Sequence, residues 1–380
     1  MKKRIILWFK NLKNKPSFIS VLASLSSILV GITFGFILLL VLSFEDSIFG
    51  LSNLLFSGVK SISRVGDVLY KAMPLIMTGL AVGFAFKTGL FNIGASGQYL
   101  MGAFFALYLG LVLKYPWWIC LIAAGIGGAL WGAIPGLFKA FLNVNEVITS
   151  IMFNWIGLYL VNLIISNQPK MLGDFYGSTA DRTANLDVAN KSAIIPKLGL
   201  NELFNNRTVS IGIIIAIIIA IIIHIILNKT TFGYELKACG FNKDASKYAG
   251  INEKRNIILS MTIAGLFAGI GGGLYYLNGG ATYAMPKALQ AMGFSGIPVA
   301  LLGQSSPIGI IFSAFFISYI QVGGELMQPE FSSEVINIII SVIIYISAFS
   351  LLFKDLIFKK LNRNKNKEIS SSNTIVKGDI

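Results

Sequence analysis

The sequence predicts an all-α membrane protein that crosses the bilayer about ten times. The 380-residue chain is 55% hydrophobic, has a mean hydropathy of +0.73 and is only 13% charged, a composition that a water-soluble domain would not tolerate. Its apolar residues form long runs bounded by charged and turn-forming residues, as helices that span a bilayer require. Its basic residues gather outside these runs, as they do in proteins inserted in membranes.

Ten apolar runs approach the roughly 20 residues that a helix needs to cross a bilayer. The first follows a basic stretch, lacks a small-residue cleavage site and is too long for a signal-peptide core, so we expect an uncleaved span. An even number of crossings places both ends of the chain on the same side of the membrane. The predicted spans are residues 17–43, 70–86, 97–113, 117–138, 147–165, 208–227, 257–277, 288–303, 307–323 and 335–353.

Three clusters of basic residues set the predicted orientation. Six Lys and Arg lie in residues 1–16, six in 228–256 and seven in 354–380, and cytoplasmic segments of membrane proteins are enriched in such residues. We expect a cytoplasmic N-terminus at 1–16, a transmembrane domain at 17–353 and a polar, partly disordered cytoplasmic tail at 354–380. The net charge of +14 is explained by this pattern, and no basic stripe with interleaved aromatics is left for a nucleic acid.

The segments predicted to lie outside the cell differ in character. Residues 44–69 mix charges with Ile, Leu and Phe and predict an interfacial helix. The longest outer segment, 166–207, is large enough to meet an external partner, but it would equally suit a passive loop. The turn at 324–334 carries Glu residues without Lys or Arg, which agrees with an outer location.

The most polar internal stretch is the predicted cytoplasmic loop at 228–256, between the sixth and seventh spans. It mixes Lys and Arg with acidic residues, and a short helix-like segment lies between Gly240 and Gly250. A membrane protein with little water-facing surface needs such a protrusion when a soluble partner must act on it. The alternative is an ordinary connection that is rich in Lys because cytoplasmic loops are.

Glycine and proline are placed where close packing or helix breaks are expected. Glycines recur at every fourth position in two spans, a spacing that lets helix backbones approach closely in lipid. We interpret them as packing faces between helices and not as binding sites. They are Gly128, Gly132 and Gly136 in the fourth span and Gly265, Gly269 and Gly273 in the seventh. Prolines are expected to interrupt three spans at Pro74, Pro135 and Pro298, and broken helices are a common way to build a substrate site.

The sequence lacks the residues that several classes of function require. We expect the membrane-embedded spans to be free of Asp, Glu, Lys and Arg, which argues against proton or ion coupling. The sequence contains no GxxxxGK[ST] phosphate-binding loop, no metal-ligand cluster and no HExxH or GxSxG motif, so we expect no enzyme activity, no metal and no cofactor. His224 is interpreted as structural, and Cys120 and Cys239 as free thiols on opposite sides of the membrane.

Neutral amides and aromatics concentrate in two stretches. Residues 86–103 join the second and third spans, and residues 293–309 break the eighth span and link it to the ninth. An inverted five-plus-five repeat would relate the third span to the eighth, and interrupted segments at matching places point to a central site. Amides beside aromatic rings suit a neutral ligand with hydrogen-bonding edges, although each amide alone is more often contact between helices.

Four blocks, in order and spacing over most of the chain, resemble the permease subunits of ATP-binding-cassette (ABC) importers for nucleosides, relatives of the ribose-type sugar permeases. The blocks are PLIMTGLAVGFAFKTGLFNIGASGQYLMGA (74–103), NEVITSIMFNWIGLYLVN (145–162), KACGFNKDASKYAGINEKRNI (237–257) and GFSGIPVALLGQSSPIGI (293–310).

The resemblance implies roles for residues in each block. It makes 228–256 the loop that couples to the ATPase, through Ala238, Gly240, Asn242, Ala245, Tyr248, Gly250 and Ile251. The substrate path would be formed by Phe91, Asn92, Gly94, Gly97, Gln98, Asn145, Glu146, Asn154, Phe294 and Gln304. The sequence departs from the family pattern at Ser96, Pro298 and Gln304.

The resemblance also implies partners and a mechanism. The chain is expected to be a permease in the cell membrane that pairs with a second permease subunit, identical or paralogous. The pair would bind two ATPase subunits and receive a neutral nucleoside, with a purine nucleoside as the candidate, from an extracellular binding lipoprotein. A simple-sugar importer is the alternative within the same class. A secondary transporter without an ATPase is the alternative of another class, and the uncharged spans disfavour it.

Overall fold

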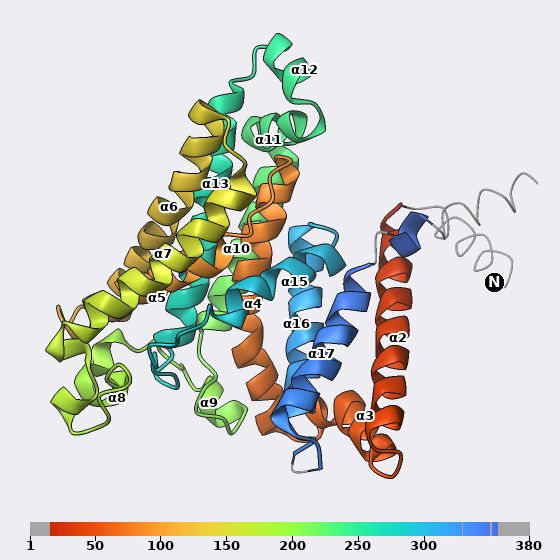
Figure 1. Ribbon diagram of the computed structural model, residues 1–380, viewed down its shortest axis with the longest axis vertical. Coiled ribbons are helices and arrows are strands. Elements are labelled where there is room, and N and C mark those ends of the chain that lie inside the picture. Colours follow the sequence, from red (N-terminus) through yellow and green to blue (C-terminus); the bar gives the residue numbers. More distant parts are fainter. Residues whose placement is uncertain (1–15, 329, 350–351, 356–380) are drawn as a thin grey trace, which may run out of the picture.

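The computed structural model describes residues 16–328, 330–349 and 352–355 (Figure 1). The predicted N-terminal segment up to Lys15 and the tail after Asp355 lie outside the described residues. Within the described ranges the chain is helical, and its extended pairing is one isolated antiparallel bridge between Leu172 and Thr183. The prediction of an all-α membrane protein is confirmed.

The long helices are joined by short helices and loops. The long ones are α2 (Pro16–Leu42), α4 (Ile62–Lys87), α5 (Ala95–Leu111), α6 (Trp117–Leu142), α7 (Glu146–Ser166), α10 (Gly212–Lys229), α13 (Glu253–Tyr276), α16 (Pro307–Glu325) and α17 (Ser333–Ala348). The shorter ones are α3 (Ser47–Phe56), α8 (Leu186–Ala189), α9 (Leu200–Leu203), α11 (Thr231–Phe241), α12 (Lys243–Tyr248), α14 (Ala291–Phe294) and α15 (Gly296–Leu302). Single 3₁₀ turns lie at Ser57–Val59, Pro169–Met171, Asp174–Tyr176 and Lys191–Ala193.

Eight helices in the described part of the chain are long and apolar enough to cross a membrane. The predicted third and eighth spans are shorter. The third is α5, which has 17 residues and is about 26 Å long, slightly less than the roughly 30 Å of hydrocarbon. The eighth is broken at Ser295 into α14 and α15. The two short spans are the pair that a five-plus-five repeat would relate, and the repeat itself stays a prediction.

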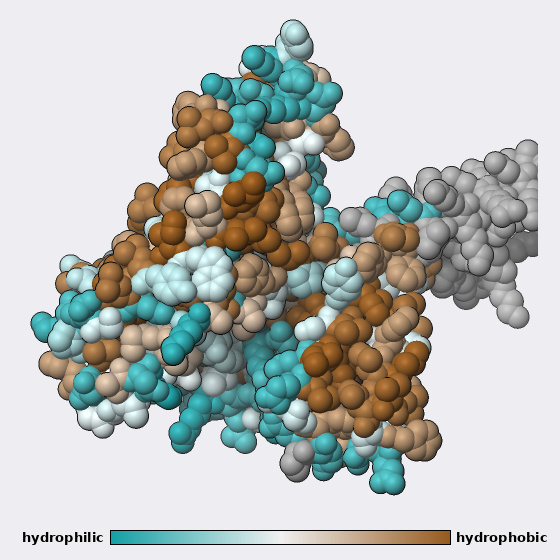
Figure 2. Space-filling view, viewed as in Figure 1, coloured by the Kyte–Doolittle hydropathy of each residue, from teal (hydrophilic) through white to brown (hydrophobic). Residues whose placement is uncertain are grey.

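The two ends of the molecule are polar and its middle is apolar. In Figure 1 the α11–α12 pair lies at the top, the start of α2 and the described end of α17 lie near mid-height at the upper ends of their helices, and α3, α8 and α9 lie toward the bottom. Figure 2 shows hydrophilic residues over the α11–α12 tip and along the lower edge, with hydrophobic surface between them. This banding suits a bilayer, and the assignment of the α11–α12 end to the cytoplasm stays a prediction.

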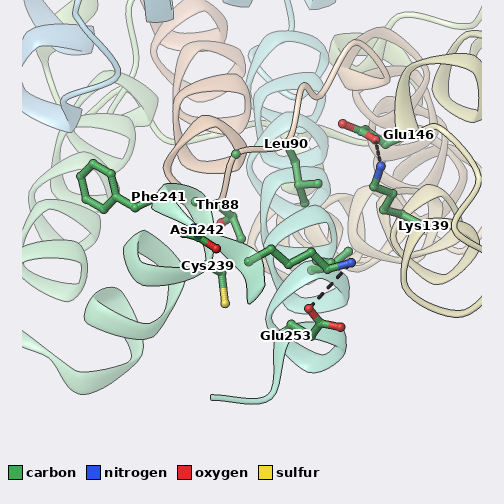
Figure 3. A pocket seen from close by; sticks show the side chains of 12 residues that line it. Thr88, Leu90, Lys139, Glu146, Cys239, Phe241, Asn242 and Glu253 are labelled. Carbon is green, nitrogen blue, oxygen red and sulfur yellow. Dashed lines mark ion pairs between the residues drawn. The ribbon is translucent and has the colours of Figure 1, made fainter. Parts of the chain in front are cut away.

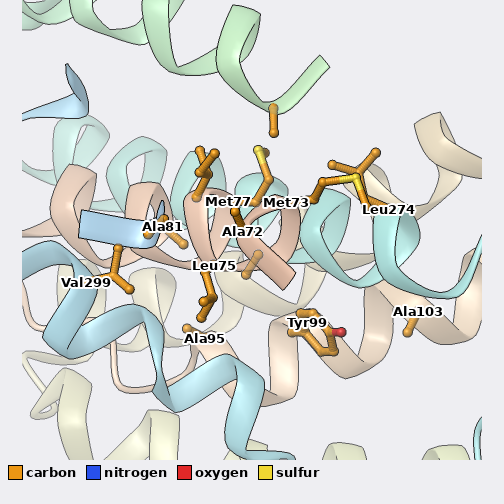
Figure 4. Packing of buried hydrophobic residues seen from close by; sticks show 14 of the residues in the cluster. Ala72, Met73, Leu75, Met77, Ala81, Ala95, Tyr99, Ala103, Leu274 and Val299 are labelled. Atoms are coloured by element: carbon orange, nitrogen blue, oxygen red, sulfur yellow. The ribbon is translucent and has the colours of Figure 1, made fainter. Parts of the chain in front are cut away.

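Helix α4 lies at the centre of the packing. In the hydrophobic 18-residue stretch of α4, 83% of the chain is buried inside the protein. The corresponding stretch of the peripheral α2 is 22% buried. Figure 4 shows Met73 and Leu75 of α4 packed among Tyr99 of α5, Leu274 of α13 and Val299 of α15. Helix α4 packs against α10 and α13 and also against α15 and α16. A shift at either end of α4 would therefore reach most of the fold.

The predicted glycine faces are confirmed as sites of backbone contact. An added Cβ on Gly128 of α6 would come within 2.3 Å of the Gly265 carbonyl oxygen of α13, and one on Gly132 within 2.5 Å of the Met261 carbonyl oxygen. On another side of α13, a Cβ on Gly102 of α5 would lie 2.2 Å from the Gly269 Cα. Helices α5, α6 and α13 therefore touch through their main chains, as small residues permit in lipid.

Two expectations about the spans are wrong. Helices α4 and α6 continue through Pro74 and Pro135, because neighbouring helices can satisfy the groups that a proline frees; the break lies at Ser295, three residues before Pro298. The spans are also not free of charge, since Lys71 lies within α4 and forms an ion pair with Glu325 at the end of α16. Glu325 is the last residue of α16 and its side chain is 64% exposed, whereas Lys71 lies in the third turn of α4 and its side chain is 20% exposed.

The segments predicted to lie outside the cell are more structured than the sequence indicated. Residues 62–69, expected to belong to an outer connection, form the first two turns of α4, and the predicted interfacial helix is the short α3. In the 166–207 segment, the Thr183 amide donates to the Tyr283 carbonyl at 2.8 Å and the Tyr283 amide donates to Thr183 Oγ1 at 2.9 Å. The Tyr283 hydroxyl also donates to Asn162 Oδ1 of α7 at 2.7 Å. These bonds fix the segment to the helical body.

Candidate functional site

The predicted coupling loop folds as the two helices α11 and α12. Each helix that begins in this region is capped by the side chain before it: Thr230 Oγ1 accepts from the Gly233 amide, Asn242 Oδ1 from the Ala245 amide and Asn252 Oδ1 from the Arg255 amide. Such caps satisfy amides that the first helical turn leaves free. Gly250 has a φ of +81°, the left-handed conformation that lets the chain leave α12 and enter α13.

One face of the loop is seated in the protein and the other is open. Leu236 is fully buried and Cys239 is nearly so. On the other face, the side chains of Phe241 and Tyr248 are 91% and 94% exposed. Two nearly bare aromatic rings on a water-facing protrusion are typical of a surface that a partner covers. The sequence did not single out Phe241, although an aromatic residue in so polar a stretch was the available signal.

The other predicted coupling residues divide between the two faces. Asn242, Ala245 and Gly250 are exposed, whereas Ala238 and Ile251 are half-buried. Gly240 is open on one side and touches the body on the other: an added Cβ would lie 2.3 Å from the Lys87 carbonyl oxygen and 3.0 Å from the Gly89 nitrogen. The end of α11 therefore rests directly on the loop between α4 and α5.

A pocket of about 290 Å³ lies at this contact (Figure 3). Its wall includes two ion pairs, Lys139 with Glu146 at 2.9 Å and Lys243 with Glu253 at 3.7 Å. The remaining lining residues are Thr88, Gly89, Leu90, Cys239, Gly240, Phe241, Asn242 and Ile257. The pocket thus brings together Glu146 from the predicted substrate path and Gly240 and Asn242 from the predicted coupling loop.

The amides of the predicted substrate path form a buried network at the start of α5. Asn92 and Gln98 bond each other twice, with Asn92 Nδ2 donating to Gln98 Oε1 at 2.8 Å and Gln98 Nε2 donating to Asn92 Oδ1 at 3.0 Å. Asn154 of α7 accepts from the Gly97 amide at 2.8 Å and donates to the Ile93 carbonyl at 3.0 Å. All three amide side chains are at most 1% exposed, so in this conformation they hold the α4–α5 loop in place.

Two glycines make this network fit. An added Cβ on Gly97 would lie 2.8 Å from Asn154 Oδ1, and one on Gly94 would lie 3.1 Å from Gln98 Nε2 and from Ser150. Either position therefore excludes a larger side chain unless the amides move. Phe91 continues the same loop and stacks on Phe86, with ring centroids 5.4 Å apart.

The two stretches predicted to form a central site meet at Ser96 and Gly293. Ser96 Oγ donates to the Gln290 carbonyl at 3.0 Å, and an added Cβ on Gly293 would lie 2.3 Å from the Ser96 Cα. The N-terminus of α5 therefore packs against the short α14. Phe294 follows Gly293 on α14 and is half-buried. The two segments therefore lie together, and their role in a central substrate site stays a prediction.

The remaining path residues lie elsewhere. Asn145 caps α7, where its Oδ1 accepts from the Val147 amide at 2.8 Å. Gln304 lies in the turn between α15 and α16, with φ values of +52° for Gln304 and +51° for Ser305, and its Oε1 accepts from Lys354 Nζ at 3.2 Å. The described residues contain no group of three or more His, Cys, Asp or Glu that could hold a metal.

Residues 64–348 match the model of a family described as branched-chain amino acid transport system / permease component. The guanosine ABC transporter permease NupP of Bacillus subtilis is 37% identical over 352 residues, covering 91% of this chain and 98% of NupP. The nucleoside ABC transporter permease NupB of Lactococcus lactis is 37% identical over 339 residues, covering 86% and 91%. The glucose ABC transporter permease TsgB13 of Haloferax volcanii is 28% identical over 300 residues, covering 76% and 77%. No solved structure matches.

Proposed function

The chain belongs to this family of transport-system permease components, and from that membership we propose that it is the membrane permease subunit of an ABC importer that carries nucleosides into the cell. It is a multi-pass protein of the cell membrane, and ATP hydrolysis takes place on a separate subunit. The chain itself makes and breaks no covalent bonds. Its work is to stabilise two packings of its helices that open to opposite sides of the membrane.

The observation that carries the nucleoside assignment is the extent of the likeness to NupP and NupB. Each is 37% identical along nearly its full length, whereas the glucose permease TsgB13 is 28% identical over a smaller share. NupP is a guanosine permease, which supports a purine nucleoside as the substrate. The buried amides near the broken helix suit a neutral ligand that offers hydrogen-bonding edges and a flat apolar face.

The shape of the α11–α12 pair supports an ATPase as its partner. It projects from the helical body, exposes Phe241 and Tyr248 almost fully and seats Leu236 in the core. A partner that grips the exposed face would move α11 against the α4–α5 loop. We further propose that two permease subunits bind two ATPase subunits, and that a binding lipoprotein delivers the nucleoside at the opposite face, where the 166–207 segment is fixed to the body.

The substrate path is proposed to run past the meeting point of α5 and α14. A one-residue turn at Ser295 separates α14 from α15, although Ser295 keeps right-handed helical dihedral angles of −60° and −17°, and such interruptions at membrane depth are tolerated where they are buried in protein or line a water-filled cavity. The break at Ser295 lies among half-buried residues, including Phe294. It therefore suits a position on the path, with the buried amides of the α5 start as the support behind it.

Uptake by reconstituted vesicles tests this function. The permease, its partner permease, the ATPase and the binding protein are placed in liposomes, and labelled guanosine, glucose and amino acid are supplied outside with ATP inside. We expect guanosine uptake that needs ATP and persists when the proton gradient is collapsed. ATP-dependent uptake of glucose alone would establish the sugar importer, and uptake driven by a proton gradient without ATP would establish a secondary transporter.

A further inference from the structure

We propose that the backbone contact between Gly89 and Gly240 is the joint through which the coupling loop moves the substrate path, so that Gly89 is a positioning residue for transport. The proposal rests on the proposed function, because it needs an ATPase that moves α11. It adds a specific route within the permease: from α11 to the α4–α5 loop, and from that loop to the broken helix α14–α15.

The joint has no side chain on either side. An added Cβ on Gly240 would lie 2.3 Å from the Lys87 carbonyl oxygen, and one on Gly89 would lie 3.3 Å from the Gly240 Cα and carbonyl oxygen. Gly89 also has a φ of +72°, which an L side chain rarely adopts. A displacement of α11 toward the body is therefore transmitted from main chain to main chain, without a rotamer that can absorb it.

Helix α11 is well placed to deliver such a displacement. Its inner face carries Leu236, which is fully buried, and the helix packs against α4, α10 and α13. Its outer end carries the exposed Phe241. By contrast, nothing lies within 4 Å of an added Cβ on Gly250. Helix α11 meets the body tightly at both ends: an added Cβ on Gly233 would lie 2.3 Å from the Ile226 carbonyl oxygen of α10, and Gly240 makes the equally close contact with the α4–α5 connection.

The α4–α5 loop is held so that it moves as a unit. At its start, Thr88 Oγ1 donates to Ser260 Oγ of α13 at 2.8 Å. Farther on, Asn154 bonds the Ile93 carbonyl and the Gly97 amide, and Asn92 bonds Gln98. Because these bonds are buried, breaking one without replacement is costly. When α11 is displaced, the α4–α5 loop therefore moves as a whole and does not unfold.

The far end of this unit is the contact with α14. Only seven residues after Gly89, Ser96 packs against Gly293 and donates to the Gln290 carbonyl. The route from Gly240 to Gly293 therefore runs through main-chain contacts and buried hydrogen bonds alone. The pocket of about 290 Å³ beside Gly89 supplies free volume on the same side of the loop.

Alanine substitutions with a matched control test the joint. Gly240→Ala adds the clashing Cβ and, because alanine is the better helix former, a loss cannot be assigned to weaker helix propensity. Gly89→Ala adds strain at a φ of +72°, and Gly177→Ala is its control, since Gly177 has a φ of +76° and open space around it. Each variant is compared at matched membrane abundance for ATPase co-purification, ATP hydrolysis and nucleoside uptake.

We expect Gly89→Ala to retain the ATPase and its basal hydrolysis while uptake and nucleoside-stimulated hydrolysis fall at least about tenfold. Gly240→Ala should lose uptake to the same extent, whatever it does to ATPase binding, and Gly177→Ala should behave as wild type. A second readout uses native Cys239, which lines the pocket, in a Cys120→Ala background. Its rate of reaction with a small maleimide should change when vanadate traps the ATPase in the wild type, and should stop responding in Gly240→Ala.

The outcomes separate the two proposals. If wild-type permease neither retains an ATPase nor transports with ATP, the proposed function fails. If wild type transports but Gly240→Ala and Gly89→Ala transport equally well, or if vanadate leaves Cys239 reactivity unchanged in the wild type, the joint is overturned while the function stands. Loss of ATPase binding in Gly89→Ala would also overturn it, since the contact would then serve only to shape the docking surface.

Discussion

Lys139 Nζ lies 2.9 Å from Glu146 Oε2, and this ion pair joins the end of α6 to the start of α7 at the wall of the α11 pocket. Both side chains are mostly shielded, at 25% and 12% exposed. Glu146 also stands in the first turn of α7, where a negative charge is favoured by the helix dipole. The pair therefore holds the corner between the two helices.

We predict that the losses of stability caused by Lys139→Met and Glu146→Gln are not additive. Each single change leaves one charge without its partner, whereas the double change leaves none, so a double-mutant cycle should give a coupling of about 1 kcal/mol. Thermal unfolding of the four purified proteins in detergent measures it. Additive losses would show that the pair contributes no net stability.

The glycine contact between α6 and α13 gives a prediction with a control on the same helix. Gly128→Ala brings a Cβ within 2.3 Å of a main-chain oxygen, whereas Gly125→Ala brings one to 3.3 Å from the flexible Ile270 side chain. Overpacking of this kind costs about 1–3 kcal/mol. We expect Gly128→Ala to lower the unfolding temperature in detergent and Gly125→Ala to leave it nearly unchanged. Equal effects would contradict the backbone contact.

The exposed aromatics of the coupling loop should anchor the ATPase. Phe241→Ala or Tyr248→Ala should weaken the association by about 2 kcal/mol, or roughly 30-fold. Phe175→Ala in the outer segment is the control, because that ring is 58% exposed but lies far along the chain from α11–α12. Co-purification of the ATPase at several concentrations measures the change. If all three variants bind alike, these rings carry no docking energy.

Gly250 is predicted to matter for its conformation and not for its size. The space around it is open, but its φ is +81°, which Asn and Asp tolerate better than Ala. We therefore expect ATPase association to fall in the order Gly, then Asn and Asp, then Ala. A loss that follows side-chain volume instead would show that added bulk is the cause.

The orientation of the chain can be tested with introduced cysteines in a Cys120→Ala, Cys239→Ala background. A reagent that cannot cross the membrane should label Cys at Ser178 in intact cells and miss Cys at Asp244, which should react only after permeabilisation. Both positions are exposed. Ser246 is a poor probe because it is 4% exposed. Labelling at position 244 from outside would overturn the predicted topology.

Composition and spacing predicted the architecture well. Apolar runs located the helices, because a spanning helix must satisfy its own backbone groups and present apolar side chains. Glycines at every fourth position indicated the faces through which α6 and α13 pack. Span ends were less accurate: α4 begins eight residues before the predicted 70–86 span, and Arg64 and Asp67 in its first two turns led the sequence analysis to assign these residues to a connection. Charges near a helix end look the same in sequence as charges in a loop.

The contacts within the candidate site could not be predicted from the sequence. Sequence placed Asn92, Gln98 and Asn154 on the substrate path, but it could not show that these amides would satisfy one another, because that depends on how α7 lies against α5. Nor could it show the contact between Gly89 and Gly240, which joins residues 151 positions apart. Glycines carry no side-chain signal that indicates a partner.

The main-chain contacts among α5, α6 and α13 also bear on how the protein assembles. When glycines meet, no rotamer freedom is lost, so association of these helices avoids the entropic cost that ordering long side chains carries. The pairing of α2 with α17 differs, because there the glycines Gly31 and Gly35 meet the branched side chain and main chain of Ile343. On warming, α2 and α17 should therefore separate first, and the three glycine-joined helices should be the last to part.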